Sequence, residues 1–160
     1  MAESTVVAVP RDGQITLTNG DATSYICSYE SGDLTYSEDL AERIVIYDRG
    51  TIVGLRSGND AVPSVSFTVH FREFMNASAN TLLDFIAETN FLSGASSTGG
   101  TGYEPYLVDL EFKADMTSLS GSNTKVTMTK VLITASFSEG SPDSISCTGE
   151  VYGTITRAAG

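Results

Sequence analysis

The sequence predicts a mainly β protein, a small β-sandwich or barrel flanked by one α-helix. β-Branched residues, Ser and Gly are abundant and Trp is absent, a balance that favours strands and turns. Runs in which apolar and polar residues alternate recur between clusters of turn-forming residues, as expected for strands with one buried face. The 160 residues show no tandem repeat and no linker-like stretch, so residues 1–160 are expected to form a single domain with its own core.

The N-terminal part of the chain is expected to hold two pairs of strands. Gln14–Thr18 and Ser24–Glu30 flank an Asn-Gly-Asp turn signal. Arg43–Tyr47 and Thr51–Arg56 follow, joined by a short Asp-Arg-Gly link. Two β-rich runs with such a link are typical of a hairpin, so a hairpin is predicted over these two runs.

The middle of the chain changes from strand periodicity to helix periodicity. From Ser64 to Arg72 apolar and polar residues alternate without exception, which predicts a strand with one buried and one wetter face. A helix is predicted over residues 79–90, where several apolar residues cluster at helical spacing. These residues are Leu82, Leu83, Phe85 and Ile86. A helix this short needs a sheet to pack against.

Three further strand segments are predicted in the C-terminal part. Tyr106–Lys113 alternates regularly. Lys125–Ser138 changes phase between Met128 and Val131, which a β-bulge or a sharp bend produces. The last strand keeps one face over Ile145–Ile155 and carries two glycines on that face, which indicates bending or a close backbone approach.

Charge limits the classes of partner. Twenty acidic residues against nine basic ones give a net charge of −11, and a surface of this sign repels phosphate backbones. Specific nucleic-acid binding is therefore not expected. Apolar runs are too short for a membrane-spanning helix, so no membrane partner is expected. Cys27 and Cys147 lie in apolar runs and match no metal or redox spacing, which predicts two buried thiols.

Catalytic patterns are thin. The single histidine, His70, falls on the polar face of its predicted strand, and no nucleophile motif accompanies it. The Gly-rich segment Gly94–Gly102 lacks the Lys and Ser/Thr of a phosphate loop. Glu38, Asp39 and Glu42 lie close together but have no Trp to stack a sugar. We therefore expect no enzyme activity, no cofactor and no metal site.

Several local sequences go beyond composition. Arg43–Arg56 leads into Ser64–Phe74, and the helix signal Thr81–Ile86 comes next. Gly99–Pro105 then precedes a strand, and Phe137–Ser146 precedes the last one. Together, over residues 12–157, they resemble the tail tube proteins (major tail proteins) of long-tailed bacteriophages and related tail-like particles.

This resemblance implies an architecture and a function. In the family, a long projecting hairpin from each of six subunits joins into an inner barrel that lines a channel. The resemblance implies that this long projecting hairpin lies within residues 24–56 of this chain. Rings stack into a tube around a tape-measure protein, and DNA later passes through without specific binding. The implied partners are other copies of the chain, the tape-measure protein, the tail terminator and the distal tail or baseplate proteins. The implied location is the phage tail of the virion, assembled in the host cytoplasm.

Two sets of residues are candidates for this function. Edge strands are hazardous unless paired, so the hairpin strands are predicted to pair between subunits. Their residues are Ile44, Val45, Ile46, Thr51, Ile52 and Val53. A channel wall that grips phosphates would stall DNA, so some of the acids in or beside the hairpin are predicted to face the lumen. These are Glu30, Asp33, Glu38, Asp39, Glu42 and Asp48.

Three alternatives remain open from the sequence. A monomeric β-sandwich binding module, of carbohydrate-binding or adhesin type, accounts equally well for the strands and the acidity. Another tail component of similar fold, such as a terminator ring, is the nearer alternative. A hydrolytic enzyme ranks third because it lacks a nucleophile and a base.

Overall fold

Antiparallel strands account for most of the chain, which confirms the predicted mainly β class. The computed structural model describes residues 9, 12–27, 32–38, 41–70, 83–103, 106–115 and 123–159. In chain order the strands are β1 (Gly13–Thr18), β2 (Ser24–Cys27), β3 (Thr35–Ser37), β4 (Arg43–Asp48), β5 (Thr51–Ser57), β6 (Ser64–His70), β7 (Leu107–Ala114), β8 (Thr124–Ser138), β9 (Ser144–Val151) and β10 (Ile155–Ala159). A short helix, α1 (Asp84–Ala87), and a 3-10 turn, η2 (Asn90–Leu92), lie between β6 and β7.

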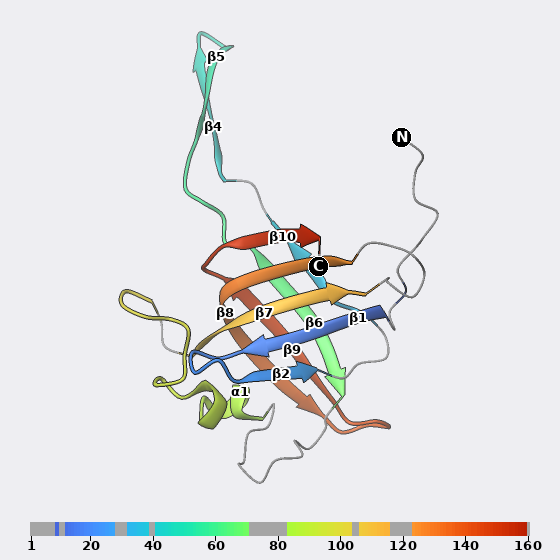
Figure 1. Cartoon of the computed structure of the whole chain (residues 1–160). Helices are drawn as coiled ribbons and strands as arrows, with labels where there is room; N and C mark the ends of the chain where they lie inside the picture. Colours follow the sequence, from blue (N-terminus) through green and yellow to red (C-terminus); the bar gives the residue numbers. More distant parts are fainter. Residues whose placement is uncertain are drawn as a thin grey trace.

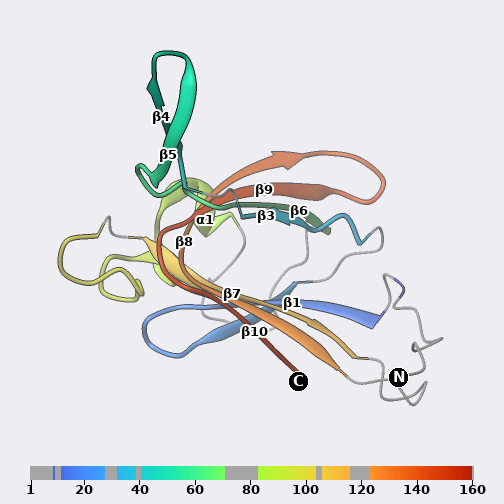
Figure 2. The ribbon, with the colours of Figure 1, turned by 90° about the horizontal axis from the view of Figure 1, so that it is seen from above.

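The strands form one folded sheet and one separate ribbon (Figure 1). The sheet has the order β2-β1-β7-β8-β9-β6-β3, with β10 on β8. Among the strands that the structure describes, β4 and β5 pair only with each other, and they project away from the rest. Seen from above, the folded sheet makes two layers, with β3, β6 and β9 in one and β1, β7 and β10 in the other (Figure 2).

β8 belongs to both layers because a bulge bends it near its middle. Val108 pairs with Val131 and Leu110 with Met128, so Asp109 faces two residues of β8 instead of one. Lys130 takes a positive φ of 55° at this point, and its N–H donates to Asp109 Oδ1 at 3.0 Å. The predicted phase change in this strand is therefore confirmed, and the bulge is its cause.

The core lies between the two layers. Buried apolar residues of β1, β7 and the first half of β8 face those of β6, β9 and the second half of β8. The largest fully buried side chains include Ile15, Leu17, Leu110, Met128 and Ile145. The alternation that predicted β6 is confirmed, since Val65, Phe67 and Val69 are all buried.

The helix ends earlier than predicted. α1 stops at Ala87 because Glu88 turns into the left-handed region, with a φ of 51°. The buried Asp84 carboxylate accepts from the Asn90 side-chain amide at 3.1 Å and holds the chain in this turn. Residues 79–82 of the predicted helix lie outside the described residues.

The predicted apolar stripe of this helix is narrower in the structure. Phe85 is buried, and its ring lies 5.9 Å from that of Phe91. Leu83 and Ile86 are exposed instead of packed, and Leu82 lies outside the described residues.

The predicted last strand is divided in two. β9 ends at Val151, and β10 starts at Ile155 and pairs with the first half of β8. The backbones of Gly153 and β8 come close at this change of partner, where the Gly153 N–H donates to the Thr129 carbonyl at 3.1 Å. A Cβ at Gly153 would lie 2.8 Å from the Thr129 carbonyl carbon. The predicted close backbone approach is confirmed here.

Two predicted strand ends are not tested, and one strand was not expected. Residues 28–30 and 71–72 of two predicted strands lie outside the described residues. β3 was not predicted. It pairs with β6 in antiparallel fashion, and two hydroxyl contacts add to this pairing. These are Thr35–Ser66 at 2.7 Å and Ser37–Ser64 at 3.0 Å.

Candidate assembly surface

The β4–β5 ribbon, Arg43–Ser57, is called the arm below. Its two strands are joined by Arg49 and Gly50, which have positive φ values of 48° and 86°. Two central residues with positive φ make the hairpin turn whose twist matches that of the flanking strands. Glycine takes this conformation without strain, so the Arg-Gly link closes the hairpin tightly. The long hairpin predicted within residues 24–56 is therefore present at its C-terminal end.

The arm leaves its apolar side chains in water. None of its residues is buried. Exposed fractions of the large apolar side chains run from 38% to 63%. They belong to Ile44, Val45, Ile46, Tyr47, Ile52, Val53 and Leu55. An apolar projection of this kind marks a surface that another molecule covers.

The arm's side chains lie on two faces, and a bulge shifts the register between the two strands. Residues directly opposite each other across a ribbon share a face. Val45 lies opposite Leu55 and Tyr47 opposite Ile52, and these four form the apolar face. Val53 is the extra residue of the bulge, since the register shifts between Ile46 and Tyr47.

The other side of the ribbon is called the mixed face. It carries Ile44 opposite Arg56, Ile46 opposite Gly54, and Asp48 opposite Thr51. Both faces therefore expose isoleucine or larger side chains, and neither rests on the body. Burial of both faces requires that the arm be enclosed by more than one neighbour, or sit between a neighbour and another arm.

Backbone hydrogen bonds join the two chain segments at the base of the arm to each other. The Gly58 N–H donates to the Glu42 carbonyl at 2.6 Å, and the Glu42 N–H donates to the Asn59 carbonyl at 3.0 Å. A Cβ at Gly58 would lie 3.1 Å from Glu42 Cβ. The two chain segments thus stay close where the arm begins, and the ribbon leaves the sandwich as a pair.

The predicted acidic residues are spread over several places. Asp33 accepts the Thr68 N–H at 3.0 Å beside β3, and Glu38 is ion-paired with Arg157 of β10. Glu42 lies at the base of the arm, and Asp48 lies at its tip. Glu30 and Asp39 lie outside the described residues. Which acids would face a lumen therefore stays a prediction.

The arm itself is basic, which the sequence analysis did not predict. Arg43, Arg49 and Arg56 against Asp48 give it a formal charge of +2, leaving −13 for the rest of the chain. The candidate acidic residues end at Asp48, whereas Arg49 and Arg56 follow it in the arm. A count over the hairpin's own boundaries would have found this signal.

No protein family model and no curated protein matches this sequence. The fold recurs in contractile injection systems. The sheath/tube terminator of the extracellular contractile injection system PVC, in the extended state, aligns with a TM-score of 0.59 at 8% identity, over 99% of this chain and 100% of that one. A chain of the PVC sheath-tube complex, also extended, aligns with a TM-score of 0.53 at 11% identity, over 92% and 89%.

These comparisons establish a shared fold. The resemblance to tail-like particles, first noted from local sequences, is therefore supported at this coarse level by whole-chain structural neighbours.

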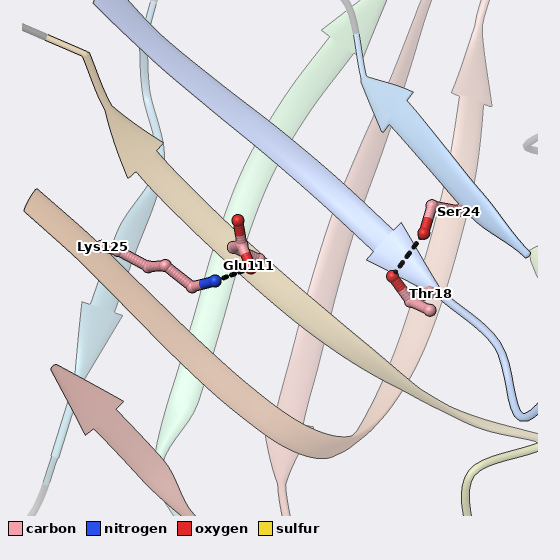
Figure 3. A network of polar contacts seen from close by, with 4 residues as sticks. All are labelled: Thr18, Ser24, Glu111 and Lys125. Atoms are coloured by element: carbon pink, nitrogen blue, oxygen red, sulfur yellow. Dashed lines mark hydrogen bonds and ion pairs between the residues drawn. The ribbon is translucent and has the colours of Figure 1, made fainter. Parts of the chain in front are cut away.

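The outer faces of the two layers differ in chemistry. On the β1–β7–β8 side, Lys125 Nζ lies 2.6 Å from Glu111 Oε2, and Thr18 and Ser24 share a hydroxyl contact of 3.0 Å (Figure 3). The outer face of β3, β6, β9 and the second half of β8 is called the hydroxyl face. It carries Thr35, Ser37, Ser64, Ser66, Thr68, Thr134, Ser136, Ser146 and Thr148.

A shallow groove of about 490 Å³ runs along the hydroxyl face. Tyr36, Leu132 and Glu150 join the hydroxyl groups that line it. One aromatic ring at an edge strand is a poor platform for stacking a sugar. His70 lies at the end of β6, opposite Ser144 of β9.

Both thiols are free and buried, as predicted. Burial raises the pKa of the Cys147 thiol to about 12. Burial, and secondly the neighbouring Cys147, raise the pKa of Cys27 well above its usual range. Neither thiol is a nucleophile at neutral pH. Among the described residues, no three His, Cys, Asp or Glu side chains are grouped to hold a metal, and no helix there is long and apolar enough to cross a membrane.

Proposed function

We propose that this chain is a structural subunit of the tube of a tail-like particle, and that copies of it join into rings through the arm. The observation that carries the proposal is the arm, a ribbon that exposes apolar side chains on both faces and that pairs with no other strand of the described chain. The whole-chain likeness to components of a contractile injection system supports it.

Burial of the arm is a strong drive to assemble. Fully burying one Val, Leu or Ile side chain stabilises by about 1.5–3 kcal/mol, and seven large apolar side chains are exposed here. The outer edges of β4 and β5 also carry unpaired backbone groups, which a neighbouring strand satisfies by β-augmentation. A head-to-tail contact that closes gives a ring. The six-fold ring is what the family resemblance implies.

The remaining partners follow from the same proposal. Stacked rings would enclose a channel holding a tape-measure protein and later DNA, with terminator and baseplate proteins at the two ends. Acids beside the arm would keep a passing polyanion from adhering. The subunit would act as a scaffold of the virion and catalyse nothing.

A second candidate is a terminator ring that caps the tube. The chain aligns with the PVC sheath/tube terminator over the full length of both chains and with the higher of the two TM-scores. The two candidates differ in one property: tube subunits stack without limit, whereas a terminator forms a single ring.

Negative-stain microscopy of the purified, concentrated chain tests the proposal. We expect hollow tubes or stacked rings for a tube subunit, and single rings for a terminator. A matched variant replaces residues 44–55 by a Gly-containing turn. It should stay folded, because β4 and β5 pair only with each other, and it should form neither rings nor tubes. A monodisperse monomer at every concentration would favour the binding module instead.

A point variant sharpens the test. Tyr47→Ser with Ile52→Ser removes one aromatic and one branched aliphatic side chain from the apolar face but keeps the two-stranded ribbon. This double variant should weaken the assembly of subunits into rings strongly. Thr127→Ser, on the outer face of β8, is the control and should assemble as the parent does.

A further inference from the structure

The arm carries the only described arginines and lysines that have no partner. Each basic side chain of the body is engaged within the described part of the chain. The contacts are Lys113 with Asp115 at 3.8 Å, Lys125 with Glu111 at 2.6 Å, Lys130 over the Tyr103 ring at 3.6 Å, and Arg157 with Glu38. Arg43, Arg49 and Arg56 are exposed and make no such contact among these residues.

Free guanidinium groups beside exposed apolar side chains are typical of an interface. Arginine is enriched at binding hot spots and pairs with carboxylates in two-pronged geometry. The arm's +2 charge on a body of −13 therefore points to a partner that is acidic. Another copy of this chain is such a partner.

The side of the sandwich away from the arm carries carboxylates. Asp21 lies in the β1–β2 turn, Glu88 follows α1, and Glu139 and Asp143 lie in the β8–β9 turn. Figure 1 shows α1 and the β8–β9 turn at the opposite end from the arm. These described segments contain no lysine or arginine. This set of segments is called the carboxylate end.

Hydrogen bonds join two segments of the carboxylate end and order a third. The Asn19 side-chain amide donates to the Phe91 carbonyl at 3.3 Å, and the Gly20 N–H donates to the Ser96 carbonyl. The β1–β2 turn is thus fixed against η2 and the loop that follows. In the β8–β9 turn, the Gly140 N–H donates to Asp143 Oδ1 at 2.9 Å.

We propose that the arginines of the arm dock on the carboxylate end of the next copy, so that stacking between rings is electrostatic and has one polarity. This inference rests on the proposed function. Apolar faces and strand edges of the arm would close the ring, and its guanidinium groups would join one ring to the next. Copies with a net charge of −11 repel each other in most orientations. An arrangement that brings the arm to the carboxylate end lowers this repulsion.

Charge reversal tests the docking. Arg43→Glu with Arg56→Glu should raise the protein concentration needed for stacking by about tenfold or more, leaving single rings. Lys113→Glu with Lys125→Glu makes the same change in net charge on the body and is the matched control, expected to stack as the parent does. Adding Glu88→Lys and Glu139→Lys to the arm variant should restore stacking.

The outcomes separate this inference from the proposed function. Stacking that survives arm reversal, or that the compensating lysines fail to restore in a folded chain, overturns the docking and leaves ring formation standing. A parent chain that never forms rings removes both. Binding of duplex DNA that arm reversal abolishes would assign the arginines to phosphates and overturn the docking between copies. Circular dichroism confirms that each variant is folded.

Discussion

At the scale of single residues, close backbone contacts and buried polar groups decide what the chain tolerates. Gly153 is the sharpest case, because the change of layer from β9 to β10 brings its Cα against the Thr129 backbone. Cys27 and Cys147 are a second case, because their thiols sit in the core without ionising.

Gly153→Ala should destabilise the fold. A Cβ would lie 2.8 Å from the Thr129 carbonyl carbon, so backbone must move, at a cost of about 1–3 kcal/mol. Urea unfolding measures this loss. Gly54→Ala is the control, since a Cβ there meets Ile46 Cδ1 at an ordinary 3.7 Å. Equal midpoints for the two variants would contradict the argument.

The two thiols predict a loss of stability at alkaline pH. Their pKa values are raised in the folded state, to about 12 for Cys147. From about pH 8.5, thiols of the unfolded chain ionise while the buried ones stay protonated. The free energy of unfolding should then fall with rising pH by up to about 1.4 kcal/mol per unit for each thiol. Cys27→Ala with Cys147→Ala should flatten this slope in urea titrations, and an unchanged slope would contradict it.

At the scale of elements, strand patterns could be predicted well where side chains alternate. β6 and the bulge in β8 followed from the period and phase of apolar residues. β3 could not, since Thr35–Ser37 has only three residues, too few to establish a period, and its place beside β6 depends on pairing with a distant segment. The break before β10 was hidden because Ile155 keeps the phase of β9. These contacts between distant segments leave no periodic trace in the sequence.

The bulge in β8 depends on one carboxylate. Asp109→Ala removes the acceptor of the Lys130 N–H and should lower stability by about 1–2 kcal/mol, because a half-buried donor loses its partner. Asp109→Asn keeps an acceptor oxygen at the same place and should cost clearly less. Thermal unfolding of both variants measures the difference. A loss as large for Asn as for Ala would show that charge, and not the hydrogen bond, matters there.

At the scale of the whole molecule, the sandwich and the arm have different roles. The sandwich buries a complete core, whereas the arm has no stability of its own, since an isolated two-stranded ribbon is marginal in water. The position of the arm's strands was predictable from the Asp-Arg-Gly link. That the arm projects from the body was implied by the family resemblance alone, because exposed and buried apolar strands have similar composition. The arm's need for partners becomes visible in the structure, where the sandwich leaves both faces of the arm uncovered.

Assembly should therefore show in stability as well as in microscopy. A partner that binds only the folded chain raises the melting temperature with concentration. We expect the melting temperature of the parent chain to rise as protein concentration increases tenfold, measured by scanning calorimetry. The variant lacking residues 44–55 should melt at one temperature throughout, because its sandwich is intact and its contact surface is gone. A concentration-independent melting temperature for both chains would mean that the arm is not the surface through which copies join. An equal rise for both would place the contact on the sandwich, with the hydroxyl face as the next surface to substitute.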